Sequence, residues 1–377
     1  MADLALILAL FALVALALHL ATVGLVAWRL RGGQRADRPG QPPVSLLRPL
    51  CGQDYQLDQT LTSSFTQDYA GYEVIFCVER EDDPAVAVAR AAIEAHPEVP
   101  ARLLIGQDAV SGNPKLNNLV KGWNAARHDW IVMSDCNVLL PPDFLRACVA
   151  RFDERTGLVS SPAIGIRPNG LWGALECGFL NTYQARWQLA ADCVGLGYAQ
   201  GKTLFWRRGV AEAGGGLPAL GREMAEDIAS TKLVRAQGLK VRLARMPFPQ
   251  PIGRRRLSAV WGRQLRWAKV RRMGVPLVFA SEILTGAVPP LLALAVLALI
   301  GAAGWAWLPL LALVWFGAEW ALARGAGWPS GPRDVLAWIL RDLMMPALWV
   351  AAWLGRGFTW RGNQMDKAEA QGLRPAE

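Results

Sequence analysis

The stretch RRRLSAVWGRQLRWAKVRR, residues 254–272, separates two kinds of sequence in this chain. Upstream of it lies the acidic cluster Glu223–Asp227, and downstream, from Gly274, the chain is apolar almost to its end. The stretch itself is rich in Arg and Lys, contains Trp267 and has no acidic residue. This pattern predicts an anionic substrate that is handled at a bilayer surface. The positive flank of a membrane helix would explain the cations but not the acidic cluster, so we expect both roles.

The composition indicates a soluble domain joined to a membrane region. The 377 residues are 53% hydrophobic and include 17 Trp, with a mean hydropathy of +0.20. The net charge of +9 does not favour a nucleic-acid partner, because the chain has no zinc-finger spacing and no aromatic RNA-binding signature. Anionic lipid headgroups and a diphosphate ligand explain this charge better. The six cysteines form no C-x-x-C pair, which predicts no disulfide framework, no zinc site and a reducing compartment. No obligate protein partner is expected.

Residues 4–28 carry no charge and predict an N-terminal membrane helix. At about 1.5 Å per residue this helix exceeds the roughly 30 Å hydrocarbon core, and the apolar run is too long for a signal peptide. Arg29, Arg31 and Arg35 follow it. The positive-inside rule therefore places the next domain in the cytoplasm, as in a protein of the bacterial inner membrane or its equivalent.

The C-terminal region predicts two or three further membrane helices. Residues 283–318 are uncharged and too long for one span, and the glycines of 301–304 offer a turn between two helices. Residues 334–354 are a third candidate, but Arg341 and Asp342 lie in the middle of it. Because a charge inside a membrane needs a partner, Glu319 could pair with Arg341. Alternatively, this last segment is re-entrant or lies at the interface.

The region between the apolar ends predicts an α/β domain with a mostly parallel sheet. Short apolar runs that fit buried strands alternate with helical stretches. The aromatic residues of the helical stretch 171–191 would lie either against lipid or in the protein core. Ligands are expected at the carboxyl ends of the parallel strands. The expected strands are 44–50, 73–78, 102–105, 130–134, 158–163, 203–207 and 241–246, and the expected helices are 57–66, 84–95, 115–126, 171–191 and 222–237.

The predicted domain organisation follows from these segments. A membrane helix at 1–30 and a linker at 31–43 precede a cytosolic domain at 44–273. The last part of that domain, 257–273, is expected to be an interfacial helix. The rest of the chain is then a membrane region of two to three helices at 274–363 and a polar tail at 364–377.

Three aspartates lie where such a domain would use carboxylates: Asp83, Asp135 and Asp227. Asp135 follows an apolar strand directly, whereas Asp83 precedes Pro84 and could simply cap the next helix. In a sugar-nucleotide transferase one carboxylate receives the nucleoside, and a second holds a divalent ion on the diphosphate. A third accepts the proton of the attacking hydroxyl. Arg266 and its neighbours can add positive charge where the leaving diphosphate develops its own charge.

The chain resembles the ceramide glucosyltransferase family from about Val44 into the C-terminal membrane region. Ordered motifs carry the resemblance: LLRPL at 46–50, CVEREDDP at 77–84, GNPKLNNL at 112–119, SDCN at 134–137, AED at 225–227, RQLRW at 263–267, AWILRD at 337–342 and TWRG at 359–362. The resemblance implies a GT-A fold, in which a Rossmann-like α/β domain holds the site. It also implies inverting transfer of a hexose, most readily glucose, from a UDP-sugar to the primary hydroxyl of a membrane lipid such as ceramide.

The same resemblance implies roles for the carboxylates. Asp83 would bind the nucleotide, Asp135 the metal and diphosphate, and Asp227 would be the general base. The implied cofactor is a divalent ion, Mg²⁺ or Mn²⁺, held by Asp135 together with Asn137. One base and no carboxylate nucleophile in the motifs imply a single displacement, which gives a β-glycosyl lipid at the cytosolic leaflet.

Basic, amide and aromatic residues complete the implied site. Lys115 and Asn117 would touch the donor near its phosphates or base. Arg263, Arg266 and Trp267 would form the element that closes over the diphosphate and the acceptor. Residues 171–191 and 258–273 would form the entrance for the lipid, with basic residues towards headgroup phosphates.

Two departures from the family pattern bear on the ligands. The second motif is Asp135-Cys136-Asn137, where many related transferases have Asp-x-Asp, so the metal would have fewer charged protein ligands. Gln184 stands where animal members carry a His associated with donor binding. The donor sugar therefore remains open among glucose, galactose, glucuronate and N-acetylglucosamine.

Other functions remain open at this point. The same site could serve diacylglycerol or hopanoid lipids, because the lipid is read by a groove that motifs do not describe. A processive polysaccharide synthase also uses an Arg-Trp element, but its channel needs more membrane helices than this chain offers. A membrane scaffold or lipid transporter with an inactive transferase domain is the alternative outside enzymes, although the three aspartates and Arg266-Trp267 are all present.

Overall fold

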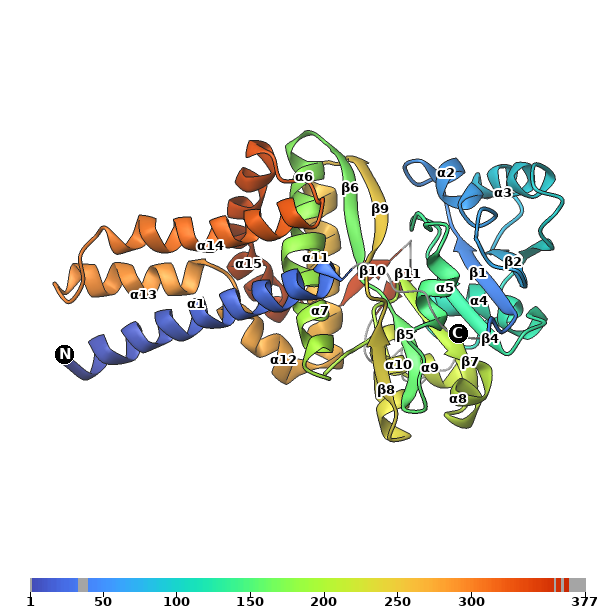
Figure 1. Cartoon of the computed structure of the whole chain (residues 1–377), viewed down its shortest axis with the longest axis horizontal. Helices are drawn as coiled ribbons and strands as arrows, with labels where there is room; N and C mark the ends of the chain where they lie inside the picture. Colours follow the sequence, from blue (N-terminus) through green and yellow to red (C-terminus); the bar gives the residue numbers. More distant parts are fainter. Residues whose placement is uncertain (1, 33–39, 356, 361–362, 366–377) are drawn as a thin grey trace. The chain divides into compact units, whose positions relative to one another are not determined.

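The computed structural model describes residues 2–32, 40–355, 357–360 and 363–365 of the chain. The chain divides into two compact units, each assembled from segments that are distant in the sequence (Figure 1). The helical unit comprises Met1–Arg31, Gly165–Ala190 and Ile252–Phe358. The sheet unit comprises Gly32–Ile164, Ala191–Pro251 and Thr359–Glu377. Most of the expected linker and polar tail lies outside the described residues, and the expected domain boundaries remain a prediction.

A seven-stranded sheet forms the centre of the sheet unit, in the order β3-β2-β1-β4-β7-β5-β8. Neighbours β1–β2, β1–β4, β2–β3 and β5–β8 run parallel, whereas β7 is antiparallel to β4 and β5. The mostly parallel sheet expected from the sequence is thus confirmed. Its strands are β1 (Val44–Leu50), β2 (Tyr72–Val78), β3 (Ala101–Ile105), β4 (Trp130–Ser134), β5 (Thr156–Ser160), β7 (Thr203–Arg207) and β8 (Lys240–Leu243).

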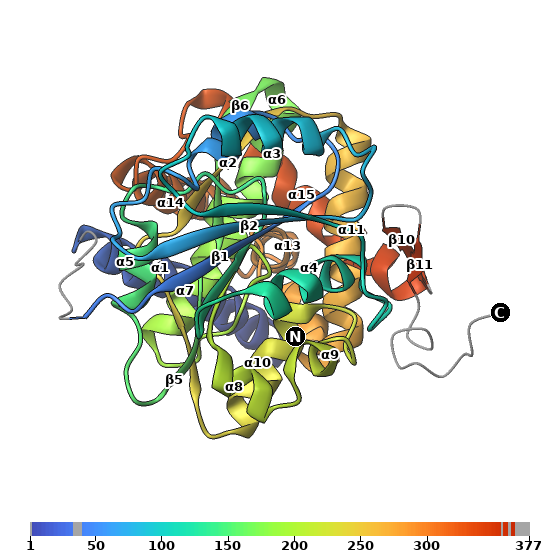
Figure 2. The ribbon, with the colours of Figure 1, turned by 90° about the vertical axis from the view of Figure 1, so that its right-hand side faces the viewer.

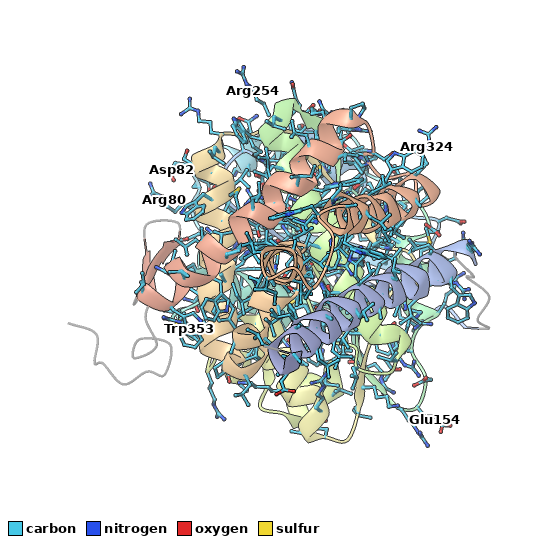
Figure 3. All side chains as sticks on the ribbon, turned by 90° about the vertical axis from the view of Figure 1, so that its left-hand side faces the viewer. Arg80, Asp82, Glu154, Arg254, Arg324 and Trp353 are labelled. Atoms are coloured by element: carbon cyan, nitrogen blue, oxygen red, sulfur yellow. The ribbon has the colours of Figure 1, made fainter. Side chains whose placement is uncertain are left out.

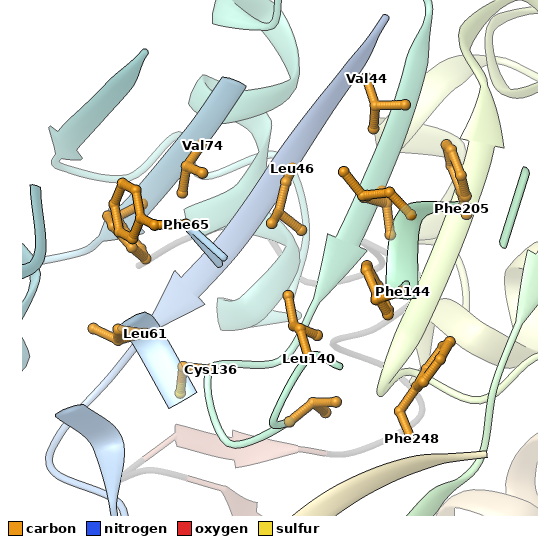
Figure 4. Packing of buried hydrophobic residues seen from close by; sticks show 14 of the residues in the cluster. Val44, Leu46, Leu61, Phe65, Val74, Cys136, Leu140, Phe144, Phe205 and Phe248 are labelled. Atoms are coloured by element: carbon orange, nitrogen blue, oxygen red, sulfur yellow. The ribbon is translucent and has the colours of Figure 1, made fainter. Parts of the chain in front are cut away.

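Both faces of this sheet are buried, because successive side chains of a strand point to opposite sides and both sets are apolar. Leu46 and Val74 belong to the core that α2, α3 and α5 cover, whereas Leu47 and Ile75 belong to the core under α4 and α10. Figure 2 shows α3 and α4 on different sides of β1 and β2, and Figure 4 shows Leu46, Val74 and Phe144 together in the first core. The helices of this unit are α2 (Leu57–Thr62), α3 (Ala85–Glu94), α4 (Pro114–Ala125), α5 (Phe144–Val149), α8 (Arg208–Ala213), α9 (Gly216–Leu220) and α10 (Glu226–Ala236).

Two short sheets accompany these elements. The expected strand 158–163 is replaced by two strands, β5 and β6 (Ala163–Asn169), and β6 pairs with β9 (Phe248–Arg254). Pro162 lies between β5 and β6, and because proline has no N–H to donate it breaks a sheet ladder. Near the C-terminus β10 (Phe358–Trp360) pairs with β11 (Asn363–Met365).

The helical unit is built from helices in three separate parts of the sequence. Within it, α1 packs on α13 and α14, and α15 packs on α6 and α11. The elements are α1 (Ala2–Arg31), α6 (Gly170–Gly178), the π-helix η1 (Phe179–Ala185), α7 (Arg186–Cys193), α11 (Leu257–Gly274), α12 (Pro276–Ser281), the 3₁₀-helix η2 (Glu282–Leu284), α13 (Val288–Leu299), α14 (Trp307–Gly325) and α15 (Pro332–Leu354).

Two helices of the described chain, α1 and α15, are long and apolar enough to cross a membrane. A third span exists if Pro276–Leu284 and Val288–Leu299, which are bent by 45° to each other, cross as one. The turn expected at 301–304 lies between α13 and α14, as predicted. With 12 residues α13 is about 18 Å long, shorter than the roughly 30 Å hydrocarbon core, so it cannot cross without 276–284.

The charges in the middle of α15 are buried and paired. The Arg341 guanidinium donates to both Glu319 carboxylate oxygens at 3.0 Å and to Asp342 Oδ1 at 2.8 Å. It also donates to the hydroxyl of Thr182, and Asp342 Oδ2 accepts the N–H of Ala287 at 2.9 Å. Charges removed from water persist only when paired in this way. The predicted pair of Glu319 and Arg341 is confirmed.

The helix expected over 171–191 is present, but its middle is the π-helix η1 rather than an α-helix. Leu175, Phe179 and Tyr183 are buried and pack with Val260 of α11 and Leu348 of α15. Of the two alternatives for the aromatic residues of this segment, these contacts favour the protein core. π-Helical turns are rare and occur often at functional sites.

Candidate active site

Asp83 joins two loops at the carboxyl ends of β1 and β2. Its carboxylate accepts the backbone N–H of Gly52 at 3.0 Å on Oδ1 and 2.9 Å on Oδ2. It also accepts the N–H of Ala85 at 2.8 Å, at the start of α3. The helix-capping role considered for Asp83 therefore exists, but the carboxylate in addition fixes the loop that follows β1. This is the strand edge at which a parallel sheet places its ligands.

Asp135 lies directly after β4 and contacts two ammonium groups. Its Oδ1 lies 2.7 Å from Lys115 Nζ, and its Oδ2 lies 3.1 Å from Lys202 Nζ. Burial alone would raise the pKa of the Asp135 carboxyl, but the two lysines outweigh burial and hold that pKa well below its usual range. The carboxylate is therefore ionised at any physiological pH.

Lys115, in the first turn of α4, is the centre of this charge cluster. Its Nζ lies 2.7 Å from Asp135 Oδ1 and 2.7 Å from Glu226 Oε1, and donates to the Gly201 carbonyl at 2.6 Å. Burial alone would lower the pKa of this ammonium group, but the two carboxylates outweigh burial and raise it. The structure thus brings together Lys115 and Asp135, which were both predicted for the site.

Asn137 takes part in the same cluster through its amide. Its Oδ1 accepts an N–H of Lys202 Nζ at 2.9 Å, and its Nδ2 donates to Asp54 Oδ2 at 3.1 Å. The two oxygens expected to hold a divalent ion, on Asp135 and Asn137, therefore both contact the Lys202 ammonium. No cluster of three or more His, Cys, Asp or Glu side chains that could hold a metal occurs in the described part of the chain. As arranged, these residues do not fit a divalent ion, which needs several anionic or neutral oxygens directed at it.

Asp227 lies at the start of α10 beside the same cluster. Its Oδ2 accepts the backbone N–H of Gly201 at 2.9 Å, and its Oδ1 accepts that of Ile228 at 2.7 Å. Gly201 fits there because it has no side chain: a Cβ at this position would lie 2.7 Å from Glu226 Oε1. The backbone can therefore pass between Lys115, which its carbonyl contacts, and the two carboxylates of α10.

The Asp227 carboxyl can change its protonation state near neutral pH. Burial and the neighbouring Glu226 carboxylate raise the pKa of Asp227 to about 6, although two backbone N–H groups and Lys115 act in the opposite direction. A carboxylate with a pKa near the working pH is suited to accept a proton in a reaction. This is the property that the predicted general base requires.

Asn117 is tied to the loop before α4. Its Oδ1 accepts the N–H groups of Val110 at 3.2 Å and Ser111 at 3.0 Å, and its Nδ2 donates to the Ser111 carbonyl at 2.8 Å. Asn113 is the N-cap of α4 and donates from Nδ2 to Glu226 at 3.0 Å. The GNPKLNNL motif is therefore a loop and helix start held by its own amides. Contact of Asn117 with a donor remains a prediction.

The RQLRW motif lies on α11, in the helical unit. Arg263 pairs with the fully buried carboxylate of Glu176 on α6 at 2.9 Å. Trp267 packs against Cys177, Leu180 and Ile252. Within this unit, two of the three predicted residues of the motif therefore anchor α11 to the elements on which it lies. Arg266 is half-buried on the same helix, and its predicted contact with a diphosphate stays a prediction.

The middle of that motif contacts η1. Gln184 donates from Nε2 to Gln264 Oε1 at 3.0 Å. Gln184 is the position at which animal family members are expected to have a His. Its side chain therefore contacts α11, the helix that carries the RQLRW motif.

Just before α11, the Arg254 side chain points away from the ribbon, as Figure 3 shows.

Sequence reasoning missed three residues of the charge cluster: Lys202, Glu226 and Asp54. Glu226 could have been found, because it adjoins Asp227 in the AED motif. Lys202 carries no local signal, since it reaches Asp135 only through the antiparallel pairing of β7 with β4. Asp54 likewise reaches Asn137 from the loop after β1.

Comparisons with known proteins identify the family of the chain. The sequence profile of glycosyl transferase family 21 matches residues 5–371. Ceramide glucosyltransferase 3 of Caenorhabditis elegans is 27% identical over 354 residues, which cover 92% of this chain and 77% of that protein. The ceramide glucosyltransferase of Komagataella phaffii is 26% identical in an alignment of 416 positions, gaps included, that covers 85% of this chain and 81% of that protein.

A solved structure shares the fold. The mannosyltransferase PcManGT from Pyrobaculum calidifontis, solved in complex with GDP-Man and Mn²⁺, has a TM-score of 0.53 and 18% sequence identity. The likeness covers 92% of this chain and 98% of that one. Together with the mostly parallel sheet it confirms the expected GT-A fold. The profile match over almost the whole length identifies the group: this chain belongs to glycosyl transferase family 21.

Proposed function

We propose that this chain transfers a hexose, most readily glucose, from a UDP-sugar to the primary hydroxyl of ceramide, with inversion to a β-glycoside. The observation that carries the proposal is the Asp227 carboxylate, whose pKa is about 6 and which lies beside the Lys115–Asp135–Lys202 cluster. A base that can accept a proton near neutral pH and cations that can bind a diphosphate are the two parts this reaction needs. The ceramide acceptor is suggested by the ceramide glucosyltransferases to which this chain is similar.

The proposed reaction is a single displacement. The acceptor hydroxyl oxygen attacks C1 of the sugar and its proton passes to Asp227. The bond between C1 and the diphosphate oxygen breaks, and its electron pair leaves with UDP. Because attack and departure occur on opposite faces, an α-linked donor gives a β-linked product. The ammonium groups of the cluster stabilise the charge that develops on the diphosphate.

Other predicted residues have proposed roles in the same step. Asp83 and Asn117 would position the nucleoside, and Lys115 would fix the Asp135 carboxylate. On α11, Arg266 and Trp267 would act on the diphosphate and the acceptor, while Arg263 holds the helix through its pair with Glu176.

We further propose a membrane location with the transferase domain, residues 44–273, in the cytoplasm. The basic residues that follow α1 and those of 254–272 are the basis for this orientation. The acceptor would then enter from the cytosolic leaflet of a bacterial inner membrane or its equivalent.

The test is a transfer assay with the purified full chain in detergent. Ceramide, diacylglycerol and a hopanoid are offered against a panel of UDP-sugars, each with Mg²⁺, Mn²⁺ or EDTA. We expect a β-glucosyl ceramide from ceramide and UDP-glucose, identified by mass spectrometry and NMR of the anomeric proton.

The other outcomes of the panel are equally informative. Product from diacylglycerol or a hopanoid alone would keep the chemistry and change the acceptor. An α-linked product would refute the single displacement. No product and no UDP release with any pair would reject the enzyme in favour of a scaffold or lipid transporter.

A further inference from the structure

Lys202 owes its position to the sheet rather than to a local motif. It directly precedes β7, which pairs with β4 so that Thr203 faces Ser134. The N–H of Asp135 donates to the Lys202 carbonyl at 3.1 Å, which fixes the two residues side by side. The Lys202 side chain is 12% exposed, so it is largely withdrawn from water without being sealed from it. A lysine there has a defined direction, towards the Asp135-Cys136-Asn137 motif.

The Lys202 ammonium contacts both side-chain oxygens on which a divalent ion would have to rest. Nζ lies 3.1 Å from Asp135 Oδ2 and donates to Asn137 Oδ1 at 2.9 Å. The second oxygen of Asp135 lies 2.7 Å from Lys115 Nζ. A divalent ion placed on these oxygens would meet two ammonium groups at short range, and like charges repel strongly where water is scarce. Lys202 therefore occupies the place of the expected ion.

Lys115 and Lys202 differ in how many acceptors their ammonium groups contact. Lys115 Nζ contacts Asp135, Glu226 and the Gly201 carbonyl, which accounts for the three donors of an ammonium group. Lys202 Nζ contacts two oxygens among the residues that the structure describes, on Asp135 and Asn137. One of its N–H bonds is thus left for a further acceptor. A phosphate oxygen is the acceptor that best suits a compact cation of this kind.

We propose that the Lys202 ammonium is the cation that holds the diphosphate of the sugar-nucleotide donor, and that this contact needs no divalent ion. The inference rests on the proposed function for the identity of the donor. The remaining N–H bond of Nζ donates to a phosphate oxygen while Asp135 and Asn137 hold the ammonium in place. When the bond to C1 breaks, its electron pair stays on the diphosphate, and the same contact stabilises the added charge.

The first test is the binding of UDP to the purified full chain in detergent, measured by calorimetry in EDTA and again in Mn²⁺. We expect the two Kd values to agree within about threefold, because the protein itself supplies the cation. Loss of UDP binding in EDTA that Mn²⁺ restores would overturn the proposal, since the ion would then displace Lys202.

Substitution of Lys202 gives the second test. Lys202→Met removes the charge at similar length and should raise the Kd for UDP about tenfold or more, the worth of one charge-assisted hydrogen bond. Lys232→Met is the matched control, because Lys232 is a lysine of the same unit that is 51% exposed and pairs with Glu223. The control should bind UDP like the parent. Unchanged UDP binding by a folded Lys202→Met variant would refute the proposal.

A double variant tests whether the Lys202 ammonium stands in the place of an ion. In Lys202→Met combined with Asn137→Asp, a second carboxylate replaces the amide and the ammonium is gone. UDP binding by this double variant should become dependent on Mn²⁺ by about tenfold or more, because two carboxylates now present hard oxygens to an ion. A double variant that binds UDP equally well in EDTA and Mn²⁺ would show that Lys202 does not stand in the place of an ion.

Binding and transfer separate this inference from the proposed function. UDP binding that is independent of metal and dependent on Lys202, without transfer to any lipid, would support the role of Lys202 and reject the proposed transferase activity. Transfer to ceramide that requires Mn²⁺ for UDP binding would support the transferase and overturn the role of Lys202.

Discussion

Asp227 is the residue at which proton transfer can be separated from donor binding. Asp227→Asn keeps the size of the side chain but removes the basic oxygen, and it leaves one acceptor oxygen where Asp227 accepts the N–H groups of both Gly201 and Ile228. We expect transfer to fall by about a hundredfold or more, the usual contribution of a general base, while the Kd for UDP changes little. Glu223→Gln, which alters a neighbouring carboxylate paired with Lys232, should leave transfer intact. Transfer at near-parental rates by Asp227→Asn would exclude the residue as the base.

The raised pKa of Asp227 predicts a definite pH profile. The base must be unprotonated, and burial with the nearby Glu226 sets its pKa at about 6. Below this pH the carboxyl is protonated, so kcat/KM should fall about tenfold per pH unit, and above it the rate should level off. The profile is measured with saturating lipid from about pH 4.5 to about pH 8, a range that brackets the expected midpoint. A midpoint near pH 4 would contradict the environment described for Asp227.

Gly201 offers a prediction about backbone contact. Gly201→Ala would place a methyl group against Glu226 Oε1, at a distance that requires the carboxylate or the backbone to move. The N–H of this residue bonds Asp227 and its carbonyl bonds Lys115, so we expect transfer to fall by about tenfold or more. Gly209→Ala, with open space around the new methyl, is the control and should retain the parental rate.

The sequence alone predicts some of these site residues and does not predict others. Asp135 and Asp227 could be predicted because each lies in a recognisable motif at the start or end of an element. Lys202 could not be predicted, because it lies far from Asp135 in the sequence and the two residues meet only through the antiparallel pairing of β4 with β7.

Two arginines of α11, Arg263 and Arg266, are expected to differ in role: the first stabilises the fold and the second acts in the reaction. Arg263→Ala would leave the buried Glu176 carboxylate without its partner, at a cost of about 3–5 kcal/mol in the free energy of unfolding. We expect a clear fall in melting temperature in detergent. Arg263→Met combined with Glu176→Gln should recover part of that loss, because no unpaired charge remains.

Arg266→Ala, one turn further along α11, should lower the transfer rate rather than the melting temperature. If Arg266 stabilises the leaving diphosphate, transfer falls by about tenfold or more while the melting temperature stays near that of the parent. Near-normal transfer would remove Arg266 from the leaving-group site and leave Trp267 and Gln264 as the relevant residues of the motif.

Most elements of the sheet unit follow from local pattern, because buried parallel strands are short apolar runs between turns. The strands β1, β4 and β7 have the bounds expected from the sequence. The π-helix η1 could not be foreseen, since its apolar residues fit an α-helical face equally well. Its extra residue per turn is settled by packing against α11 and α15, which lie far along the chain.

For the whole molecule, the orientation in the membrane is open to a direct measurement. Cysteine is introduced at Glu154, an exposed residue of the sheet unit whose side chain points outward in Figure 3, or at Ala302, in the turn between α13 and α14. A membrane-impermeant maleimide added to intact cells should label Ala302→Cys and not Glu154→Cys. The opposite pattern would place the transferase domain outside the cytoplasm. The parent chain, whose six cysteines form no disulfide, measures the background.

The interleaved order of segments also has a consequence for biogenesis. β5 lies between β7 and β8 in the sheet, yet both partners follow the helical segment Gly165–Ala190 in the chain. Until β7 and β8 have been made, β5 has no partner at either edge in the sheet, and open strand edges recruit wrong partners. In the proposed membrane location, the nascent chain must therefore keep an unfinished sheet from misassembling after α1 has been made. Slow translation of the residues between β5 and β8 lengthens the time for which β5 is unpaired. Codon choice in this part of the gene, and the supply of chaperones during its translation, should therefore affect the yield of folded protein more than codon choice elsewhere.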